Sequence, residues 1–190
     1  MMATLFYLIG PSGSGKDALL QGLRQRLGGR APLLFAHRYI TRDWHAGGEN
    51  HIALSAEEFA QRLERGLFKL HWQANGCRYA LGIELDAWLD SGQSVIANGS
   101  RAHLEQARRC FGERLMPVEV RVDPQRLRQR LRARGREDEA AISARLARNA
   151  RLERERRGQT LRIDNNGDLD AALTRLQRLL LAHLGAPADV

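Results

Sequence analysis

The sequence has little cysteine and few aromatic residues, and it lacks long hydrophobic runs. Its two cysteines, Cys77 and Cys110, are not closely spaced to each other or to a histidine pair, so neither a disulfide framework nor a zinc site is expected. No apolar run reaches the roughly 18 residues that a membrane helix needs, and Met1 to Ile9 lacks the charged start that is typical of a signal peptide. We therefore expect a soluble, cytoplasmic protein without a membrane partner.

Lysine is almost absent, although the chain is basic. The formal net charge is +8, and all but two of the 30 Lys and Arg residues are arginine; the lysines are Lys16 and Lys69. No aromatic residues alternate with the basic runs, so we expect no nucleic-acid partner, and small polyanionic substrates account for the charge at least as well. Where arginine is used almost everywhere else, Lys16 indicates a position that needs a compact ammonium group.

A glycine-rich run lies between a short apolar strand and a helical pattern. It consists of Gly10, Pro11, Ser12, Gly13, Ser14, Gly15, Lys16 and Asp17. In such a strand–loop–helix unit, backbone N–H groups and the helix N-terminus bind phosphates, and the lysine reaches the β- and γ-phosphates. The run therefore predicts a phosphate-binding loop for ATP rather than an ordinary loop.

The last position of this loop departs from the usual pattern. A Ser or Thr hydroxyl normally lies there as a ligand of Mg²⁺, and this chain has Asp17 instead. A carboxylate is also a hard-oxygen ligand, so we expect Asp17 to bind the metal directly or through a water. ATP and Mg²⁺ are the expected cofactors.

The rest of the chain alternates strand-like and helical segments. The strand-like runs are Thr4 to Ile9, Leu33 to Thr41, Ser94 to Asn98, Met116 to Val122 and Thr160 to Ile163. This alternation predicts an α/β fold of three layers, with a mainly parallel sheet between helices. One helix is bounded by Asp123, Pro124 and Gly135, and the last helix by Asp168 and Gly185.

With 190 residues, the chain is expected to form one domain with two inserted units. Between Gly47 and Gly82, short apolar pieces flank a helix from about Ala56 to Arg65, which predicts a small antiparallel lobe. The expected core covers residues 1–42, 83–134 and 158–185, the acceptor-binding lobe about 43–82, and an arginine-rich helical lid about 135–157. This organisation is typical of a small-molecule kinase that closes over two substrates.

Nearly the whole chain resembles the guanylate kinase branch of the nucleoside monophosphate kinases. The similar segments are Thr41-Arg42, Gly48-Glu49, His51 to Ser55 and Glu57 to Phe59 in the acceptor lobe, and Leu127 to Arg148 in the lid. The resemblance fails where that family binds guanine, because His71 stands at its glutamate position and Val95 to Gly99 has no carboxylate where it has Asp-x-Asp. In addition, His51 stands at a position where guanylate kinases have a tyrosine. A mismatched polar pocket costs a factor on the order of 10⁴, so GMP is not the expected substrate.

A closer resemblance is to the ribose 1,5-bisphosphate phosphokinase family of bacterial phosphonate breakdown. The similar segments are Gly15 to Asp17, His37 to Arg42, Gly48 to Ser55, Asn75-Gly76, Asn98 to His103 and Arg134 to Glu137. The resemblance implies transfer of the γ-phosphoryl group of ATP to the 1-phosphate of ribose 1,5-bisphosphate. The product is then 5-phosphoribosyl 1-diphosphate, and the sequence leaves open a monomer or a homodimer. Asp17, which departs from the usual phosphate-loop pattern, agrees with the pattern of this family.

The expected site residues form three groups. The loop Gly10 to Asp17 binds the nucleotide, and the catalytic residues are Lys16, Arg130, Arg134 and Arg145. The acceptor is expected at Arg38, Arg42, Glu49, His51, Asn98, Ser100 and Arg101. Several of these residues also have a purely structural interpretation. Arginine is plentiful on the lid helices, so some of these arginines can lie on the surface. Asn98-Gly99 can form a turn, and Ser100 can cap a helix. Asn165-Asn166 is either an adenine contact or a turn, and Trp72 is expected in the core.

Two other functions remain open from the sequence. The first is a guanylate kinase or another nucleoside monophosphate kinase, and the second is a non-catalytic, guanylate-kinase-like binding module. Such modules usually lose the phosphate loop or its lysine, whereas this chain keeps both. No Asp is identified as a general base, which favours a phosphate acceptor, whose oxygen is already anionic, over a hydroxyl acceptor.

Overall fold

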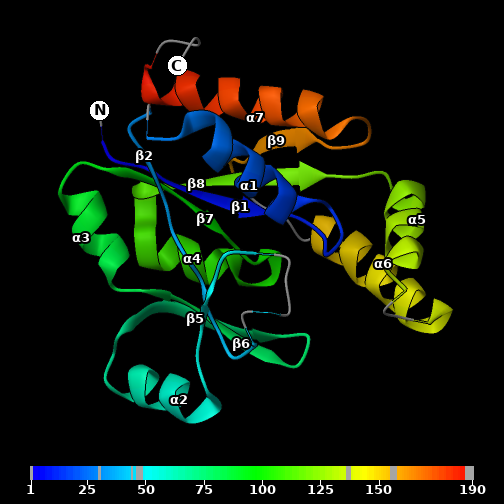
Figure 1. The fold of residues 1–190 in the computed structure, drawn as a ribbon, viewed down its shortest axis with the longest axis horizontal. Coiled ribbons are helices and arrows are strands. Elements are labelled where there is room, and N and C mark those ends of the chain that lie inside the picture. The colour runs from blue at the N-terminus through cyan, green and yellow to red at the C-terminus, as the bar shows by residue number, and fades with distance from the viewer. Residues whose placement is uncertain are drawn as a thin grey trace.

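The computed structural model describes residues 2–29, 31–43, 45, 49–135, 138–154 and 158–186. Its strands are β1 (Leu5–Ile9), β2 (Leu33–Phe35), β3 (Tyr39–Ile40), β4 (Ile52–Ala53), β5 (Phe68–Ala74), β6 (Cys77–Gly82), β7 (Ser94–Asn98), β8 (Leu115–Arg121) and β9 (Leu161–Asp164). Its α-helices are α1 (Lys16–Leu27), α2 (Ala56–Glu64), α3 (Glu84–Asp90), α4 (Leu104–Phe111), α5 (Pro124–Arg134), α6 (Glu139–Arg154) and α7 (Leu169–Leu184). The elements form the predicted α/β fold (Figure 1).

The main sheet has the strand order β2-β7-β1-β8-β9, and all of its pairings are parallel. Helices α1 and α7 cover one face and α3 and α4 the other (Figure 1). Both faces of β1 are buried, because Phe6 and Leu8 pack with α1 and α7 while Tyr7 and Ile9 pack in the opposite layer. The sheet is therefore the middle layer of the predicted three-layer fold, which explains its near-continuous apolar strands.

A second sheet, with the order β4-β3-β6-β5, forms the inserted lobe together with α2. Its β3–β6 and β5–β6 pairings are antiparallel, and its β3–β4 pairing is parallel. Leu70, Trp72 and Leu81 of this sheet belong to the same hydrophobic cluster as Tyr7 and Val95 of the main sheet. The lobe is therefore packed firmly on the body of the protein.

The prediction of one strand from Leu33 to Thr41 is wrong, because this run forms β2 in the main sheet and β3 in the second sheet. The N–H of Ala36 donates to the carbonyl of Ile96 at 2.9 Å, and the chain then crosses to the lobe. The spacing of apolar residues is similar in the strands of both sheets. The sequence pattern therefore does not show where the chain passes from the main sheet to the second sheet. The second sheet thus begins before residue 43, where the lobe is expected to start.

Helices α5 and α6 form a separate pair beside the main sheet (Figure 1). As predicted, Asp123 caps α5 by accepting from the N–H of Gln125 at 2.8 Å, and Gly135 ends it at φ 61°. The two helices share a small hydrophobic cluster of their own, built around Leu127, Leu131 and Ile142. Gly47, Gly48, Arg136, Glu137 and lid residues 155–157, named in the sequence analysis, lie outside the described residues.

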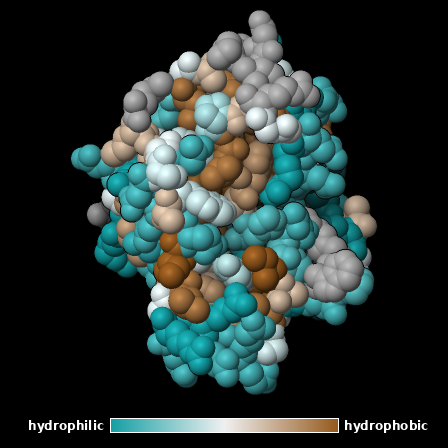
Figure 2. Space-filling view, turned by 60° about the vertical axis from the view of Figure 1, so that its left-hand side comes forward, coloured by the Kyte–Doolittle hydropathy of each residue, from teal (hydrophilic) through white to brown (hydrophobic). Residues whose placement is uncertain are grey.

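Surface hydrophobicity is scattered on the face that carries α3. Figure 2 shows separate hydrophobic areas there, divided by hydrophilic ones. Across the described part of the chain, the large apolar residues with the most exposure are Met2, Leu34, Ile52, Leu67, Ile83 and Leu169. None of the helices in that part has the length and apolar composition needed to cross a membrane.

Candidate functional site

A cavity of about 670 Å³ lies where the phosphate loop, the ends of β1 and β7, the second sheet and the α5–α6 pair meet. It brings together most of the residues that the sequence predicts for the site. These are Gly10, Ser12, Gly13, Gly15, Lys16, Asp17, Arg38, Arg42, Glu49, Asn98, Ser100, Arg101, Arg134 and Arg145. The carboxyl ends of parallel strands are the usual ligand-binding edge of such a sheet.

The phosphate loop is held closed around its lysine. The Nζ of Lys16 donates to the carbonyls of Gly10 at 2.9 Å and Pro11 at 3.0 Å. Gly15 has a φ of 89°, and a Cβ there would lie 2.5 Å from the Nδ2 of Asn165, which itself donates to the carbonyl of Ser14 at 2.7 Å. Burial lowers the pKa of Lys16 to about 8. The ammonium group of Lys16 is thus bonded to its own loop, and the N–H groups of that loop would bind a polyphosphate.

Asn165 therefore supports the phosphate loop. Its position is explained without the adenine contact that is one of the two interpretations of the sequence. Its side chain is buried, and the carboxamide of Asn166 accepts from the N–H of Asp123 at 2.6 Å. Both residues thus join the turn after β9 to neighbouring segments, as the turn interpretation expects.

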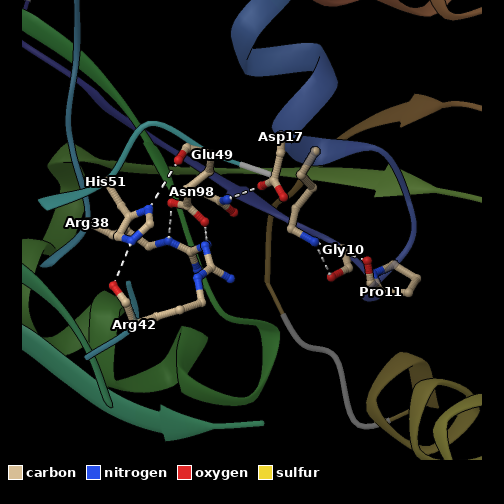
Figure 3. Close-up of polar contacts among 9 residues, drawn as sticks. Gly10, Pro11, Asp17, Arg38, Arg42, Glu49, His51 and Asn98 are labelled. Carbon is tan, nitrogen blue, oxygen red and sulfur yellow. Dashed lines mark hydrogen bonds and ion pairs between the residues drawn. The ribbon is translucent and has the colours of Figure 1, made fainter. Parts of the chain in front are cut away.

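Asp17 is fixed by the end of the neighbouring strand. Asn98 lies beside Leu8 in the parallel β1–β7 pair, and its Nδ2 donates to the Oδ1 of Asp17 at 2.7 Å (Figure 3). Burial and, next, the charge of Glu49 raise the pKa of Asp17. Asn98 is only 3% exposed, and its Oδ1 has no hydrogen-bond partner among the described residues. A carboxylate beside an unpartnered amide oxygen is a donor set that fits a hard cation such as Mg²⁺.

Arg38 and Glu49 form a buried ion pair on the opposite wall. The Nε of Arg38 donates to the Oε1 of Glu49 at 2.7 Å, a second bond joins Nη2 to Oε2, and the side chains are 12% and 10% exposed. Burial lowers the pKa of Arg38, but the hydrogen bonds and charge of Glu49 outweigh it and raise the pKa overall. The guanidinium also lies 4.9 Å from the centre of the Tyr79 ring. Arg38 is therefore rigidly placed and largely neutralised by its partner.

Arg42 differs from Arg38 in its partners. It lines the same cavity, and its buried Nε has no hydrogen-bond partner in the described chain. A buried N–H without a partner is costly, whereas a guanidinium makes strong paired bonds to a phosphate. Arg42 is thus the better candidate of the two for an anionic ligand.

His51, predicted to bind the acceptor, lies behind the cavity wall rather than in its lining. Its ring nitrogens are each 3.1 Å from a backbone carbonyl oxygen, Nδ1 from that of Glu49 and Nε2 from that of Arg42 (Figure 3). The structure therefore connects His51 to the site through these two residues.

The turn after β7 is fixed by a buried tyrosine. The N–H of Ser100 donates to the Oη of Tyr7 at 2.9 Å, and a Cβ on Gly99 would lie 2.4 Å from the Tyr7 ring. Burial raises the pKa of Tyr7 to about 12. The Oγ of Ser100 contacts the Nδ1 of His103 at 3.0 Å and makes no helix-capping bond, so the capping alternative does not explain this serine.

The expected lid arginines divide into two groups. Arg134 and Arg145 line the cavity, whereas Arg130 does not; its Nη2 donates to the carbonyl of Asn165 at 2.8 Å and ties α5 to the turn after β9. Arg148 lines the cavity as well, although it is not among the site residues expected from the sequence. It lies three residues after Arg145, one helical turn further along the same face, and this spacing is the signal that could have revealed it.

Sequence reasoning also missed the floor of the cavity. Trp72 and Ala74 on β5, and Cys77 and Tyr79 on β6, line it. Trp72 belongs to the core, as expected, and its ring also stacks on Tyr79 with centroids 5.6 Å apart. Residues two apart on a strand face the same side of the sheet. The alternation of side chains along β5 and β6 is therefore the signal that could have identified this floor.

Comparison with known proteins shows which proteins the chain resembles. A family model described as an AAA domain matches residues 7–160. The chain is 51% identical over 179 residues to ribose 1,5-bisphosphate phosphokinase PhnN of Pectobacterium parmentieri, covering 94% of each chain. It is 50% identical over 189 residues to the protein of the same name from Klebsiella pneumoniae, covering 100% of this chain and 98% of that one. Among solved structures, guanylate kinase from Anaplasma phagocytophilum superimposes with a TM-score of 0.69 at 16% identity, covering 100% of this chain and 90% of the other, which shows a shared fold.

Proposed function

The chain belongs to the ribose 1,5-bisphosphate phosphokinase family, and from this we propose that it transfers the γ-phosphoryl group of ATP to the 1-phosphate of ribose 1,5-bisphosphate. The products are 5-phosphoribosyl 1-diphosphate and ADP, and phosphonate breakdown in the cytoplasm is the expected setting. The observation that carries the proposal is the cavity itself. The phosphate loop with Lys16 faces a wall that contains Arg42, while His71, at the position of the base-binding glutamate of guanylate kinases, lies outside the lining.

The donor site is the phosphate loop. Its N–H groups and the N-terminus of α1 bind the ATP phosphates, and Lys16 neutralises charge on the transferred group. Asp17 and the Oδ1 of Asn98 would hold Mg²⁺, directly or through water. When bound there, the metal would neutralise part of the negative charge of the ATP phosphates.

The acceptor site is the wall formed by residues 38–49 and by the end of β7. Arg42 is suited to a bidentate contact with one phosphate of the sugar, and the fixed Arg38–Glu49 pair shapes the wall beside it. Ser100 and Arg101 lie at the mouth of the β7 turn, where they can contact the ribose or the second phosphate. In this assignment the second sheet with α2 is the acceptor lobe, and α6 is the main part of the lid.

The transfer needs positioning and charge stabilisation rather than a strong base. An oxygen of the 1-phosphate forms a new bond to the γ-phosphorus while the bond from that phosphorus to the β,γ-bridging oxygen breaks, and ADP leaves. The attacking oxygen is already anionic, so no proton has to be removed from it. Arg134, Arg145 and Arg148 face the cavity from the lid and would stabilise the charge of the transferring group, while Arg130 holds α5 in place.

The proposal is tested by ADP release from ATP and Mg²⁺ with four acceptors: ribose 1,5-bisphosphate, GMP, AMP and gluconate. We expect turnover with the sugar bisphosphate and at least a hundredfold lower kcat/KM with the others, because His71 replaces the base-binding glutamate of guanylate kinases and does not line the cavity. Turnover on GMP would support the nucleoside monophosphate kinase alternative. Absence of turnover on all four would favour a binding module.

A further inference from the structure

His51 lies in an unusual polar environment. It is 8% exposed, and each of its two ring nitrogens is 3.1 Å from a backbone carbonyl oxygen. A carbonyl oxygen only accepts hydrogen bonds, and a neutral imidazole carries one N–H and one lone pair. The neutral ring can therefore satisfy one of these contacts, and its lone pair would face the other carbonyl. The doubly protonated ring donates to both.

The two carbonyls belong to residues with side chains in the cavity. One is Arg42, the cation with a buried and unpartnered Nε, and the other is Glu49, the carboxylate that holds Arg38 through two hydrogen bonds. Figure 3 shows the imidazole between these two backbone segments. A single ring thus joins both ends of the segment between residues 42 and 49.

The charges around the ring come from both segments that it joins. Asp43 follows Arg42, and its pKa is lowered mainly by hydrogen bonds from His45, with a small contribution from the charge of His51. On the other side lie Glu49 and its partner Arg38. Asp43, Glu49, Arg38 and Arg42 together carry no net charge, so the doubly protonated ring is favoured by its two carbonyl contacts rather than by a local excess of negative charge.

We propose that His51 is a positioning residue whose doubly protonated ring fixes Arg42 and the Glu49–Arg38 pair in the geometry that binds the acceptor phosphate. This rests on the proposed function, since it concerns the acceptor side of that reaction. Loss of the second N–H releases one of the two backbone segments. The acceptor KM then rises, while the phosphate loop, and with it the KM for ATP, is not affected.

The kinetic test compares His51→Phe and His51→Gln with His71→Phe and His71→Gln. His71 is a matched control because it is exposed on β5 of the same lobe and does not line the cavity. His51→Phe loses both hydrogen bonds, so we expect the KM for ribose 1,5-bisphosphate to rise about tenfold or more, with kcat and the KM for ATP within about threefold. His51→Gln keeps one donor and should lie between. Unchanged acceptor KM in His51→Phe overturns the proposal.

The pH dependence separates positioning from a general packing role. The neutral ring keeps one of the two hydrogen bonds, whereas His51→Phe has neither, and lower pH favours the doubly protonated form of an imidazole. The ratio of acceptor KM between His51→Phe and wild type should therefore be larger at about pH 6 than at about pH 8. An equal ratio at both pH values would mean that His51 only fills space.

The ring protons are observable in the wild-type protein, so the test does not depend on the variants folding. Nitrogen-15 NMR of the intact, substrate-free chain at about pH 6 should show both ring nitrogens of His51 protonated. A single protonated ring nitrogen would contradict the proposal. Failure of the wild type to use ribose 1,5-bisphosphate would overturn the proposed function instead and leave the NMR result standing.

Discussion

At the residue scale, Lys16 has a matched control in the only other lysine of the chain. Lys16→Ala should reduce turnover by about 10² to 10³, because it removes charge stabilisation from the transferred group. Lys69 instead contacts Asp86 at 2.8 Å on the surface, and it does not line the cavity. Turnover of Lys69→Ala should remain within about twofold of wild type. Equal losses in both variants would contradict the assignment of Lys16.

The lowered pKa of Lys16 gives this residue a pH signature. In the free protein the pKa is about 8, and bound phosphates raise it because they favour the ammonium form. ATP binding above pH 8 therefore takes up a proton, and the affinity should fall by up to about tenfold per pH unit. Calorimetry between about pH 7.5 and 9 measures both effects. If Lys16→Ala shows the same pH dependence, another group is responsible.

Asp17 and Asn98 form a pair in which the carboxylate comes from the loop and the amide from the strand end. Asp17→Ser should weaken Mg²⁺-dependent ATP binding, and Asn98→Asp should place two carboxylates in contact and destabilise the protein. The double variant Asp17→Ser/Asn98→Asp combines the usual loop hydroxyl with an acid at the strand end, so it should recover much of the lost Mg²⁺ dependence. Calorimetry of ATP binding with and without Mg²⁺ measures this coupling, and strictly additive losses would count against a shared metal site.

Residues in one continuous motif were the easiest to predict. The loop from Gly10 to Asp17 is recognised from its own spacing, and most of its residues line the cavity. His51 was harder, because the sequence shows a polar residue in an acceptor segment but not the two carbonyls that face its ring. The roles of Arg130 and Arg148 could not be predicted for the same reason. Only the packing of the helices decides which arginine faces the cavity.

At the element scale, the two inserted units are attached differently. The second sheet shares its hydrophobic cluster with the main sheet, whereas α5 and α6 share a small cluster of their own around Leu127, Leu131 and Ile142. A unit that buries few apolar side chains opens at low free-energy cost. Movement over the substrates is therefore expected from α6 rather than from the second sheet.

Hydrogen exchange tests this difference in attachment. In the substrate-free protein, the amides of α6 should exchange faster than those of α7, which packs Leu173, Leu176 and Leu180 into the main core. A non-hydrolysable ATP analogue with ribose 1,5-bisphosphate should slow exchange in α6 and leave α7 unchanged. Exchange in α6 that does not respond to both ligands together would argue against lid closure.

Element boundaries with local chemical signals were predicted well. Asp123, Pro124 and Gly135 bound α5 as expected, because a cap and a left-handed glycine act within one turn. The prediction of a single strand from Leu33 to Thr41 is wrong for a different reason. Its division between β2 and β3 is decided by pairing with β7 and β6, which are distant in sequence.

At the scale of the whole molecule, function depends on segments that meet only in the folded chain. The segments that contain Lys16, Arg42, Asn98 and Arg145 are far apart in sequence, and all four line one cavity. The positive net charge is consistent with a reaction between two polyanions. Fold class and reaction were accessible from the order of motifs, whereas the walls of the cavity required the packing of the two sheets.

In the reaction that we propose, the acceptor atom is an oxygen of the 1-phosphate. The most direct measurement is phosphorus-31 NMR of the product formed from ATP, Mg²⁺ and ribose 1,5-bisphosphate. Transfer to the 1-phosphate gives a diphosphate at carbon 1, seen as two phosphorus nuclei coupled to each other, and leaves the 5-phosphate unchanged. A new phosphate monoester on a ribose hydroxyl, or a diphosphate at carbon 5, would contradict it.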